Sequence, residues 1–136
     1  MPVFAELGRR DPDLHLALLG LAPGKYHGFD QQRWLRQLLG QDSDLQERLL
    51  MPGVSGSMAR WYTRATVFVL PSRYEGFPNV LLEAMAAGCA CIASDCLTGP
   101  ADLILHGENG FLLSSRATSD DLSLIHISEP TRQSPI

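Results

Sequence analysis

The sequence has no hydrophobic run long enough to cross a bilayer, no cluster of basic residues and few cysteines. A membrane-spanning helix needs about 20 apolar residues, and no run in the chain approaches that length. The first residues also lack the charged and apolar segments of a signal peptide, so we expect a cytoplasmic protein. The net charge of −4 comes from scattered acidic residues rather than a block. Nucleic acids and anionic membranes are therefore poor candidate partners.

The cysteines Cys89, Cys91 and Cys96 lie close together with no histidine clustered beside them. This spacing suits a tetrahedral zinc site poorly, and a disulfide framework would need an oxidising compartment that nothing in the sequence indicates. We therefore interpret the three cysteines as buried free thiols.

The 136 residues, 45% of them hydrophobic, predict one packed domain in which strands and helices alternate. The expected strands are 14–20, 48–53, 66–71, 89–94 and 111–113. The expected helices are 31–39, 58–65 with Ser57 as its cap, and 78–87, with a short helix and turn in 99–110. This alternation predicts an α/β fold, a Rossmann-like parallel sheet with flanking helices and right-handed crossovers.

Residue types at the segment ends predict where two of these helices begin and end. Asp30 is expected to cap the helix 31–39, whose apolar face would be formed by Trp34, Leu35, Leu38 and Leu39. Proline is favoured in a first turn and glycine just after a last turn, so Pro78 and Gly88 are expected to bound the helix 78–87.

The two ends of the chain depart from this pattern. The segment "LSLIHISEPTR", Leu122–Arg132, resembles the in-frame translation of a transposon-type sequencing adaptor. We therefore interpret residues 122–136 as a non-native tail. The helix containing Phe4 and Leu7 has no preceding strand to pack upon, so we expect Met1 to be an internal start or a fragment boundary.

The loop 71–77 follows the carboxyl end of the clearest predicted strand, which is where open parallel sheets bind ligands. A helix that begins at Pro78 would present unpaired N–H groups and the positive end of its dipole, and phosphate suits that surface. Pro78 has no N–H, so the donors are expected from the main chain of its neighbours Gly76, Phe77, Asn79 and Val80.

Two acidic residues, Glu75 and Glu83, would flank this phosphate site. A carboxylate cannot bind phosphate, but it can accept two hydrogen bonds from the cis-diol of ribose or from sugar hydroxyls, so the combination predicts a nucleotide sugar. Taken alone, either acid is better interpreted as a solvated surface residue. Arg73 suits a phosphate contact and a solvated position equally well.

The stretch "FVLPSRYEGFPNVLLEAMAAGCACIAS", followed by "GENGFLL", resembles the C-terminal nucleotide-binding domain of the retaining GT-B glycosyltransferases of family four. The spacing of Glu75 and Glu83 matches the E-x7-E motif of that family, and the preceding "GVSGSMARWYTRATVFVLPS" matches the segment that leads into it. The resemblance covers roughly residues 4–113. The segment "SDCLTGPADLI" further resembles the branch that builds bacterial surface polysaccharides.

The resemblance implies that residues 1–121 are a partial nucleotide-sugar-binding domain, the incomplete C-terminal half of a GT-B fold. It implies that Glu75 acts at the transferred sugar and that Glu83 holds the ribose. The other implied donor-binding residues are Arg73, Gly76, Phe77, Pro78, Asn79, Val80, Gly53 and Val54, the last two beside the nucleobase. The family reaction is described as front-face attack assisted by the leaving diphosphate, so no protein nucleophile, metal or further cofactor is expected.

The implied function is retaining hexosyl transfer from a nucleotide sugar, with a UDP-sugar favoured, to a glycan or lipid-linked acceptor in surface polysaccharide biosynthesis. The acceptor would bind an N-terminal domain that has no match here, and the intact enzyme could contact a membrane peripherally. The cationic Arg and Lys pair of the family also has no match, so we expect this half to be inactive alone. The alternatives are a non-catalytic nucleotide-binding or interaction domain and a GT-B sugar-nucleotide epimerase, although the E-x7-E loop favours the transferase.

Overall fold

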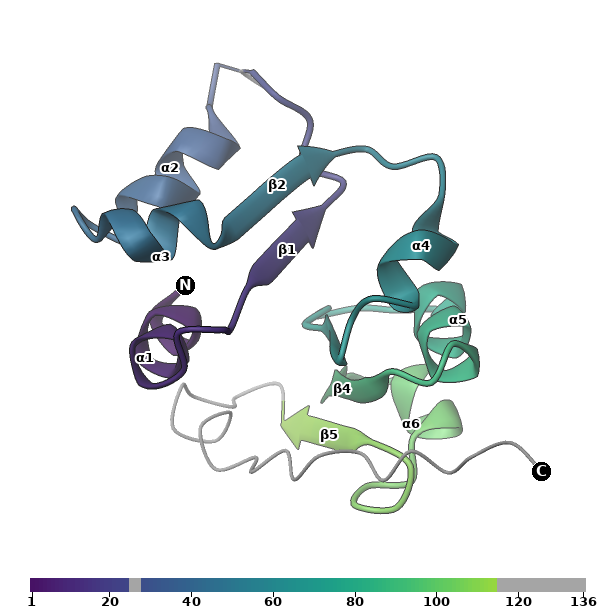
Figure 1. Cartoon of the computed structure of the whole chain (residues 1–136). Coiled ribbons are helices and arrows are strands. Elements are labelled where there is room, and N and C mark those ends of the chain that lie inside the picture. Colours follow the sequence, from purple (N-terminus) through teal and green to yellow (C-terminus); the bar gives the residue numbers. More distant parts are fainter. Residues whose placement is uncertain (25–27, 115–136) are drawn as a thin grey trace. The chain divides into compact units, whose positions relative to one another are not determined.

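The structure is a computed structural model that describes residues 1–24 and 28–114. The chain divides into two compact units, one comprising Met1–Gly56 and the other beginning at Ser57 (Figure 1), and each is described by itself. The predicted tail, residues 122–136, lies outside the described residues, and a single domain over residues 1–121 stays a prediction. In the described ranges no helix is both long and apolar enough to span a bilayer.

The N-terminal unit pairs two parallel strands and carries three helices. Its elements are α1 (Pro2–Arg10), β1 (Leu16–Leu19), α2 (Gln31–Gln37), α3 (Ser43–Glu47) and β2 (Leu49–Gly53). Strands β1 and β2 pair in parallel, with Leu16 opposite Leu49, as the sequence predicts (Figure 1). The buried core of this unit joins α1 to α3 and to the start of β2, and it consists of Phe4, Leu39, Leu45 and Leu49.

Arg48, between α3 and β2, is buried although it is charged, with 6% of its surface exposed. Its guanidinium donates hydrogen bonds to the main-chain carbonyls of Gly8 at 2.8 Å, Asp11 at 3.1 Å and Leu14 at 3.0 Å. It also pairs with Asp44, whose side chain is 73% exposed. Arg48 therefore ties the end of α1 and the approach to β1 to the segment that begins β2.

Helix α2 begins as the sequence predicts, but none of its residues is buried. The Asp30 carboxylate accepts a hydrogen bond of 2.9 Å from the N–H of Arg33, which confirms the cap. The predicted four-residue apolar face is wrong, because Trp34 is 47% exposed and Leu38 is 48% exposed. The helix ends at Gln37, and the chain turns so that Leu39, beyond the helix, enters the core instead.

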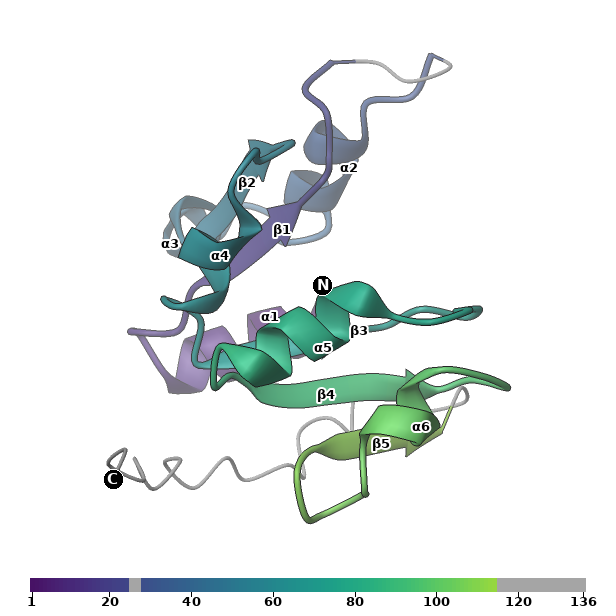
Figure 2. The same cartoon turned by 90° about the vertical axis from the view of Figure 1, so that its right-hand side faces the viewer.

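The C-terminal unit is built around a three-stranded parallel sheet in the order β3-β4-β5. Its elements are α4 (Met58–Tyr62), β3 (Val67–Leu70), α5 (Asn79–Ala86), β4 (Ala90–Asp95), α6 (Pro100–Leu103) and β5 (Phe111–Ser114). Helix α5 packs on β3 and β4 and lies along β4 in Figure 2, while α6 packs on β4. The predicted α/β architecture of parallel strands with flanking helices is confirmed.

Helix α5 ends in a hydrogen-bonded motif that requires a left-handed residue. Gly88 has φ +86°, and its N–H donates to the carbonyl of Met85 at 3.0 Å. The N–H of Cys89 donates to the carbonyl of Ala84, also at 3.0 Å. These two bonds form a Schellman motif, and they confirm Gly88 as the predicted helix stop.

The core of the C-terminal unit lies between α5 and the sheet. Its buried residues are Tyr62, Leu81, Ala84, Cys89, Cys91, Ala93 and Ile104. Cys96 is also buried, and all three cysteines are free thiols, as predicted. The Cys89 thiol donates to the carbonyl of Tyr62 at 3.1 Å, which links the end of α4 to the start of β4.

Candidate functional site

Two loops leave the same edge of the three-stranded sheet. Residues 71–78 join β3 to α5, and residues 96–99 join β4 to α6. Strands β3 and β4 run parallel with Leu70 opposite Ala93, so their carboxyl ends lie side by side. This edge is the position at which open α/β sheets bind ligands, and it holds most of the predicted site residues.

The structure places Glu75 in the loop before α5 and Glu83 within α5. Glu75 is partly buried in the loop, whereas Glu83 is exposed on α5. In the part of the chain that the structure describes, neither carboxylate forms an ion pair. Both acids are therefore available to accept hydrogen bonds from hydroxyl groups of a ligand.

The side chain of Tyr62 lies beside Glu83 from within the core. Tyr62 is 4% exposed, and within residues 1–24 and 28–114 its hydroxyl has no hydrogen-bond partner. Burial, followed by the nearby Glu83 carboxylate, raises the pKa of Tyr62 above its usual value. The Glu83 carboxylate therefore lies near the Tyr62 hydroxyl, although the two groups do not meet in hydrogen-bond geometry. The sequence analysis does not select Tyr62, because an aromatic residue in a predicted helix carries no signal of this neighbour.

The start of α5 presents unpaired main-chain N–H groups. Among the described residues, those of Gly76, Phe77 and Val80 have no acceptor, and Pro78 supplies no side-chain cap. The Asn79 N–H donates to the carbonyl of Phe77 at 3.0 Å, so in this structure it is occupied within the loop. Three of the four predicted donors are therefore free where the positive end of the helix dipole adds to them.

The remaining predicted residues fall in two places. Arg73 is exposed in the same loop as Glu75 and, in the described ranges, has no ion-pair partner. Gly53 and Val54 lie in the N-terminal unit, where Gly53 ends β2 with φ +81° and Val54 is 80% exposed.

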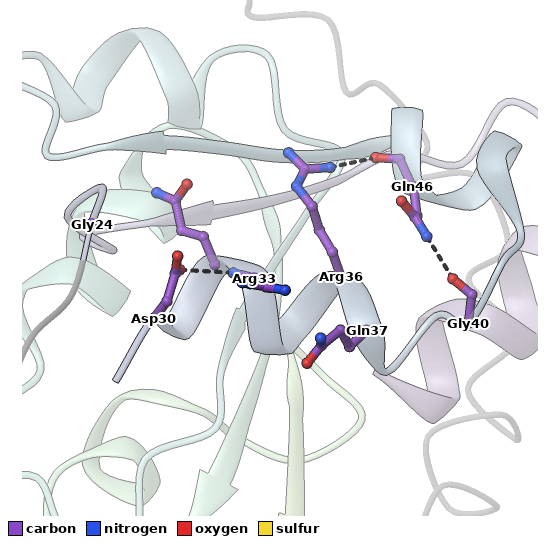
Figure 3. Close-up of a pocket in the computed structure, with 8 residues that line it drawn as sticks. Gly24, Asp30, Arg33, Arg36, Gln37, Gly40 and Gln46 are labelled. Carbon is purple, nitrogen blue, oxygen red and sulfur yellow. Dashed lines mark hydrogen bonds between the residues drawn. The ribbon is translucent and has the colours of Figure 1, made fainter. Parts of the chain in front are cut away.

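An open pocket of about 380 Å³ lies in the N-terminal unit, along α2 (Figure 3). Several of its polar groups form hydrogen bonds with one another. Asp30 accepts from the N–H of Arg33, Arg36 donates to the Gln46 carbonyl at 3.0 Å, and the Gln46 amide donates to the carbonyl of Gly40. None of the predicted site residues lines this pocket. Elsewhere in residues 1–24 and 28–114, no three His, Cys, Asp or Glu side chains gather as metal ligands do.

The buried Cys91 thiol of β4 gives the C-terminal unit a predicted pH dependence. Burial, followed by the adjacent Cys89 thiol, raises the pKa of Cys91 from its usual 9.0 to about 11. In the unfolded chain the thiol loses its proton above pH 9.0, while in the folded chain it keeps the proton up to about pH 11. The free energy of unfolding is therefore expected to fall by about 2–3 kcal/mol across this interval.

Urea unfolding of the chain and of its Cys91→Ala variant, from below pH 9.0 to about pH 11, measures this contribution. Other groups titrate in the same range, so the quantity of interest is the difference between the two proteins. We expect the unchanged chain to lose more of its free energy of unfolding than Cys91→Ala as the pH rises, so that any advantage it has over the variant below pH 9.0 shrinks or reverses. A difference that stays constant with pH would contradict the prediction.

Comparison with known proteins identifies relatives. The sequence profile described as glycosyl transferases group 1 matches residues 2–124. An exopolysaccharide phosphotransferase, SCO2592, of Streptomyces coelicolor is 39% identical over 111 residues, which are 81% of this chain and 11% of that protein. A lipopolysaccharide 1,6-galactosyltransferase of Salmonella typhimurium is 51% identical over 55 residues, which are 40% of this chain and 15% of that protein. The chain thus spans a small part of the length of these relatives.

A solved structure shares the fold. The C-terminal domain of a glycosyl transferase group 1 family protein, LpcC, from Francisella tularensis superposes with a TM-score of 0.72 and 27% sequence identity. The match covers 89% of this chain and 62% of that one. The parallel strands and flanking helices described above are therefore those of a Rossmann-like domain of the GT-B type.

Proposed function

The chain belongs to the glycosyl transferases group 1 family, and on that premise we propose that it carries the donor-binding site of a retaining glycosyltransferase. The proposed donor is a nucleotide sugar, with a UDP-sugar favoured. One observation carries the proposal: three free main-chain N–H groups at the start of α5 lie between two carboxylates that form no ion pair within the described residues. The matching ligand has an anionic group with a set of hydroxyl groups on either side of it.

In this proposal each group of the site has a defined task. The N–H groups of Gly76, Phe77 and Val80 bind the diphosphate, and with the α5 dipole they stabilise the negative charge that develops on the leaving phosphate. Glu83 accepts hydrogen bonds from the ribose cis-diol. Glu75 accepts from hydroxyls of the transferred sugar and so orients its anomeric carbon. The leaving diphosphate assists deprotonation of the acceptor, which leaves no step that needs a protein nucleophile.

Further contacts are proposed around this centre. Arg73, exposed in the same loop, would contribute a cation to the phosphate, and Pro78 would fix the turn into α5 without competing for the donors. The main chain at Gly53 and Val54 would border the nucleobase. Asn79 would join the phosphate donors only if its bond to the Phe77 carbonyl opened.

The reaction of the whole protein is proposed to be hexosyl transfer to a glycan or lipid-linked acceptor, in surface polysaccharide biosynthesis in the cytoplasm, with acceptor binding assigned to another part of the protein. The Salmonella relative is named as a galactosyltransferase of lipopolysaccharide, which supports sugar transfer. The Streptomyces relative is named as a phosphotransferase but is matched over 11% of its length, so its named activity is not extended to this chain.

Binding of UDP by the Glu83→Gln variant tests the assignment of Glu83. The substitution keeps the shape of the side chain but removes the charge that strengthens its hydrogen bonds to the diol. We expect UDP to bind about 10-fold more weakly, which corresponds to about 1.4 kcal/mol. The affinity of 2′,3′-dideoxy-UDP, which lacks both hydroxyls, should be the same for the variant and the unchanged chain. Isothermal titration calorimetry measures all four affinities.

Glu108→Gln is the matched control, because Glu108 is an exposed acid of the same unit in the turn before β5. It should leave the affinity for UDP unchanged. Equal losses for UDP and for the dideoxy nucleotide in Glu83→Gln would show that Glu83 acts through general electrostatics and not through the ribose. Absence of UDP binding by the folded, unchanged chain at millimolar concentration would count against the donor site itself.

A further inference from the structure

The loop that contains Glu75 is held by a second loop from the neighbouring strand. The hydroxyl of Thr98, in the segment between β4 and α6, donates to the main-chain carbonyl of Glu75 at 2.6 Å. The two residues are 23 positions apart in the sequence. They meet because parallel strands β3 and β4 end side by side, and the bond lies at the short end of the range for a hydroxyl donor.

The next residue, Gly99, brings the two main chains into direct contact. Gly99 is buried and has φ +98°. A Cβ atom placed there would lie 2.7 Å from the carbonyl oxygen of Gly76, 2.9 Å from Cδ of Pro78 and 3.5 Å from Cβ of Glu75. The two loops therefore pack against each other at a distance that only glycine permits.

The second loop is itself fixed at both ends. The Cys96 thiol donates to the carbonyl of Thr98 at 3.5 Å, and the Asp102 N–H donates to the carbonyl of Gly99 at 3.0 Å. Cys96 is 8% exposed and Pro100 is fully buried, so both flanks are anchored in the unit. Thr98 thus acts from a fixed support.

The direction of the Glu75 carboxylate depends on this support. In the part of the chain that the structure describes, the carboxylate has no ion pair, and Glu75 is held by the hydrogen bond that its main-chain carbonyl accepts from Thr98. Within residues 1–24 and 28–114 no hydrogen bond or ion pair holds the carboxylate itself, so the position of the main chain at Glu75 sets the region that the carboxylate can reach. The groups that hold that main chain are Thr98 and Gly99.

We propose that Thr98 is a positioning residue of the site: by holding the main chain at Glu75, it sets where the Glu75 carboxylate meets the hydroxyls of the donor sugar. The inference rests on the donor site proposed above. It adds residues 96–99 to that site as a supporting element, and it assigns Thr98 an effect on the sugar of the donor rather than on its nucleotide. Supporting groups of this kind decide how precisely a binding residue is placed.

The test compares Thr98→Val, which removes the hydroxyl and keeps the β-branched shape, with Thr98→Ser, which restores the hydroxyl. Titrations use UDP, UDP-glucose and UDP-galactose, and the sugar nucleotide that the unchanged chain binds more tightly serves as the probe. We expect Thr98→Val to bind this probe about 3-fold to 10-fold more weakly, while its affinity for UDP changes less than about twofold. Thr98→Ser should bind both ligands like the unchanged chain.

A measurement without ligand accompanies the titrations. The carbonyl 13C shift of Glu75 reports its hydrogen bond, and the 15N order parameters of residues 75–77 report how firmly the loop is held. In Thr98→Val we expect the shift to move and the order parameters to fall from about 0.85 toward about 0.6. Thr98→Ser should restore both values. Thr63→Val is the matched control, because it removes a hydroxyl that donates to the Arg60 carbonyl at 3.2 Å in the same unit.

The outcomes separate this inference from the proposed function. Unchanged shifts and order parameters in Thr98→Val, or equal losses of affinity for the probe and for UDP, would overturn the positioning role. If the unchanged chain bound neither UDP nor a UDP-sugar, the donor site and the role of Thr98 toward the sugar would both fall. In that case the shifts and order parameters would still decide whether Thr98 holds the loop.

Discussion

Replacement of Gly99 with alanine is expected to lower the free energy of unfolding of the C-terminal unit by about 3–5 kcal/mol, as the sum of two effects. The first is backbone strain, because φ +98° is a conformation that residues with a Cβ rarely adopt. The second is overlap of the new methyl group with the carbonyl of Gly76 and the ring of Pro78. Both neighbours belong to the site loop, so the substitution should also displace Glu75.

Gly107→Ala separates these two effects. Gly107 has φ +81° in the same unit, but a Cβ placed there would have no heavy atom within 4 Å. The control therefore adds strain without overlap and should cost about 1–2 kcal/mol. Each unit holds one tryptophan, so urea unfolding followed by fluorescence of Trp61 in a Trp34→Phe background reports on this unit. Equal losses in the two alanine variants would refute the close contact at Gly99.

Replacement of Arg48 with methionine is expected to destabilise the N-terminal unit by about 3–5 kcal/mol. Methionine fills a similar volume but removes the donor of the Gly8 and Leu14 carbonyls and one of the two donors of the Asp11 carbonyl, which also accepts from the N–H of Leu14 at 3.3 Å. Each buried carbonyl that loses its hydrogen bond costs about 1–3 kcal/mol, less where water reaches it. Urea unfolding followed by Trp34 fluorescence in a Trp61→Phe background measures the loss.

Asp44→Asn tests whether the ion pair or the carbonyl contacts make Arg48 important. The Asp44 side chain is 73% exposed, so its pairing with Arg48 is screened by water, and its loss should cost at most about 1 kcal/mol. If Asp44→Asn destabilised the unit as strongly as Arg48→Met, the ion pair would be the main contribution and the carbonyl contacts a minor one.

The parts of the fold that follow local rules could be predicted from the sequence. Strand β3 is rich in β-branched and aromatic residues and is followed by Pro71, Asp30 caps α2, and Gly88 stops α5. Each of these signals lies within a few residues of the boundary that it sets. The same locality explains why the loop between β3 and α5 could be selected as the candidate site.

The parts that the sequence analysis missed depend on contacts between distant segments or on short elements. Helix α3 has only five residues, although Asp42 does accept a cap hydrogen bond from the N–H of Leu45. The burial of Arg48 could not be foreseen, because its three carbonyl partners lie 34 to 40 positions earlier in the chain. The bond from Thr98 to Glu75 spans 23 positions and also leaves no local signal.

The free donors at the start of α5 belong to the main chain, and this affects how the loop can vary. Side-chain substitution at Phe77 or Val80 changes the surroundings of a bound anion but leaves the N–H groups in place. Side-chain substitutions in the loop can therefore change which ligand it selects, while the N–H groups that attract phosphate remain. A systematic alanine scan would pass over these donors, because only replacement of the peptide bond itself, for example by an ester, removes one of them.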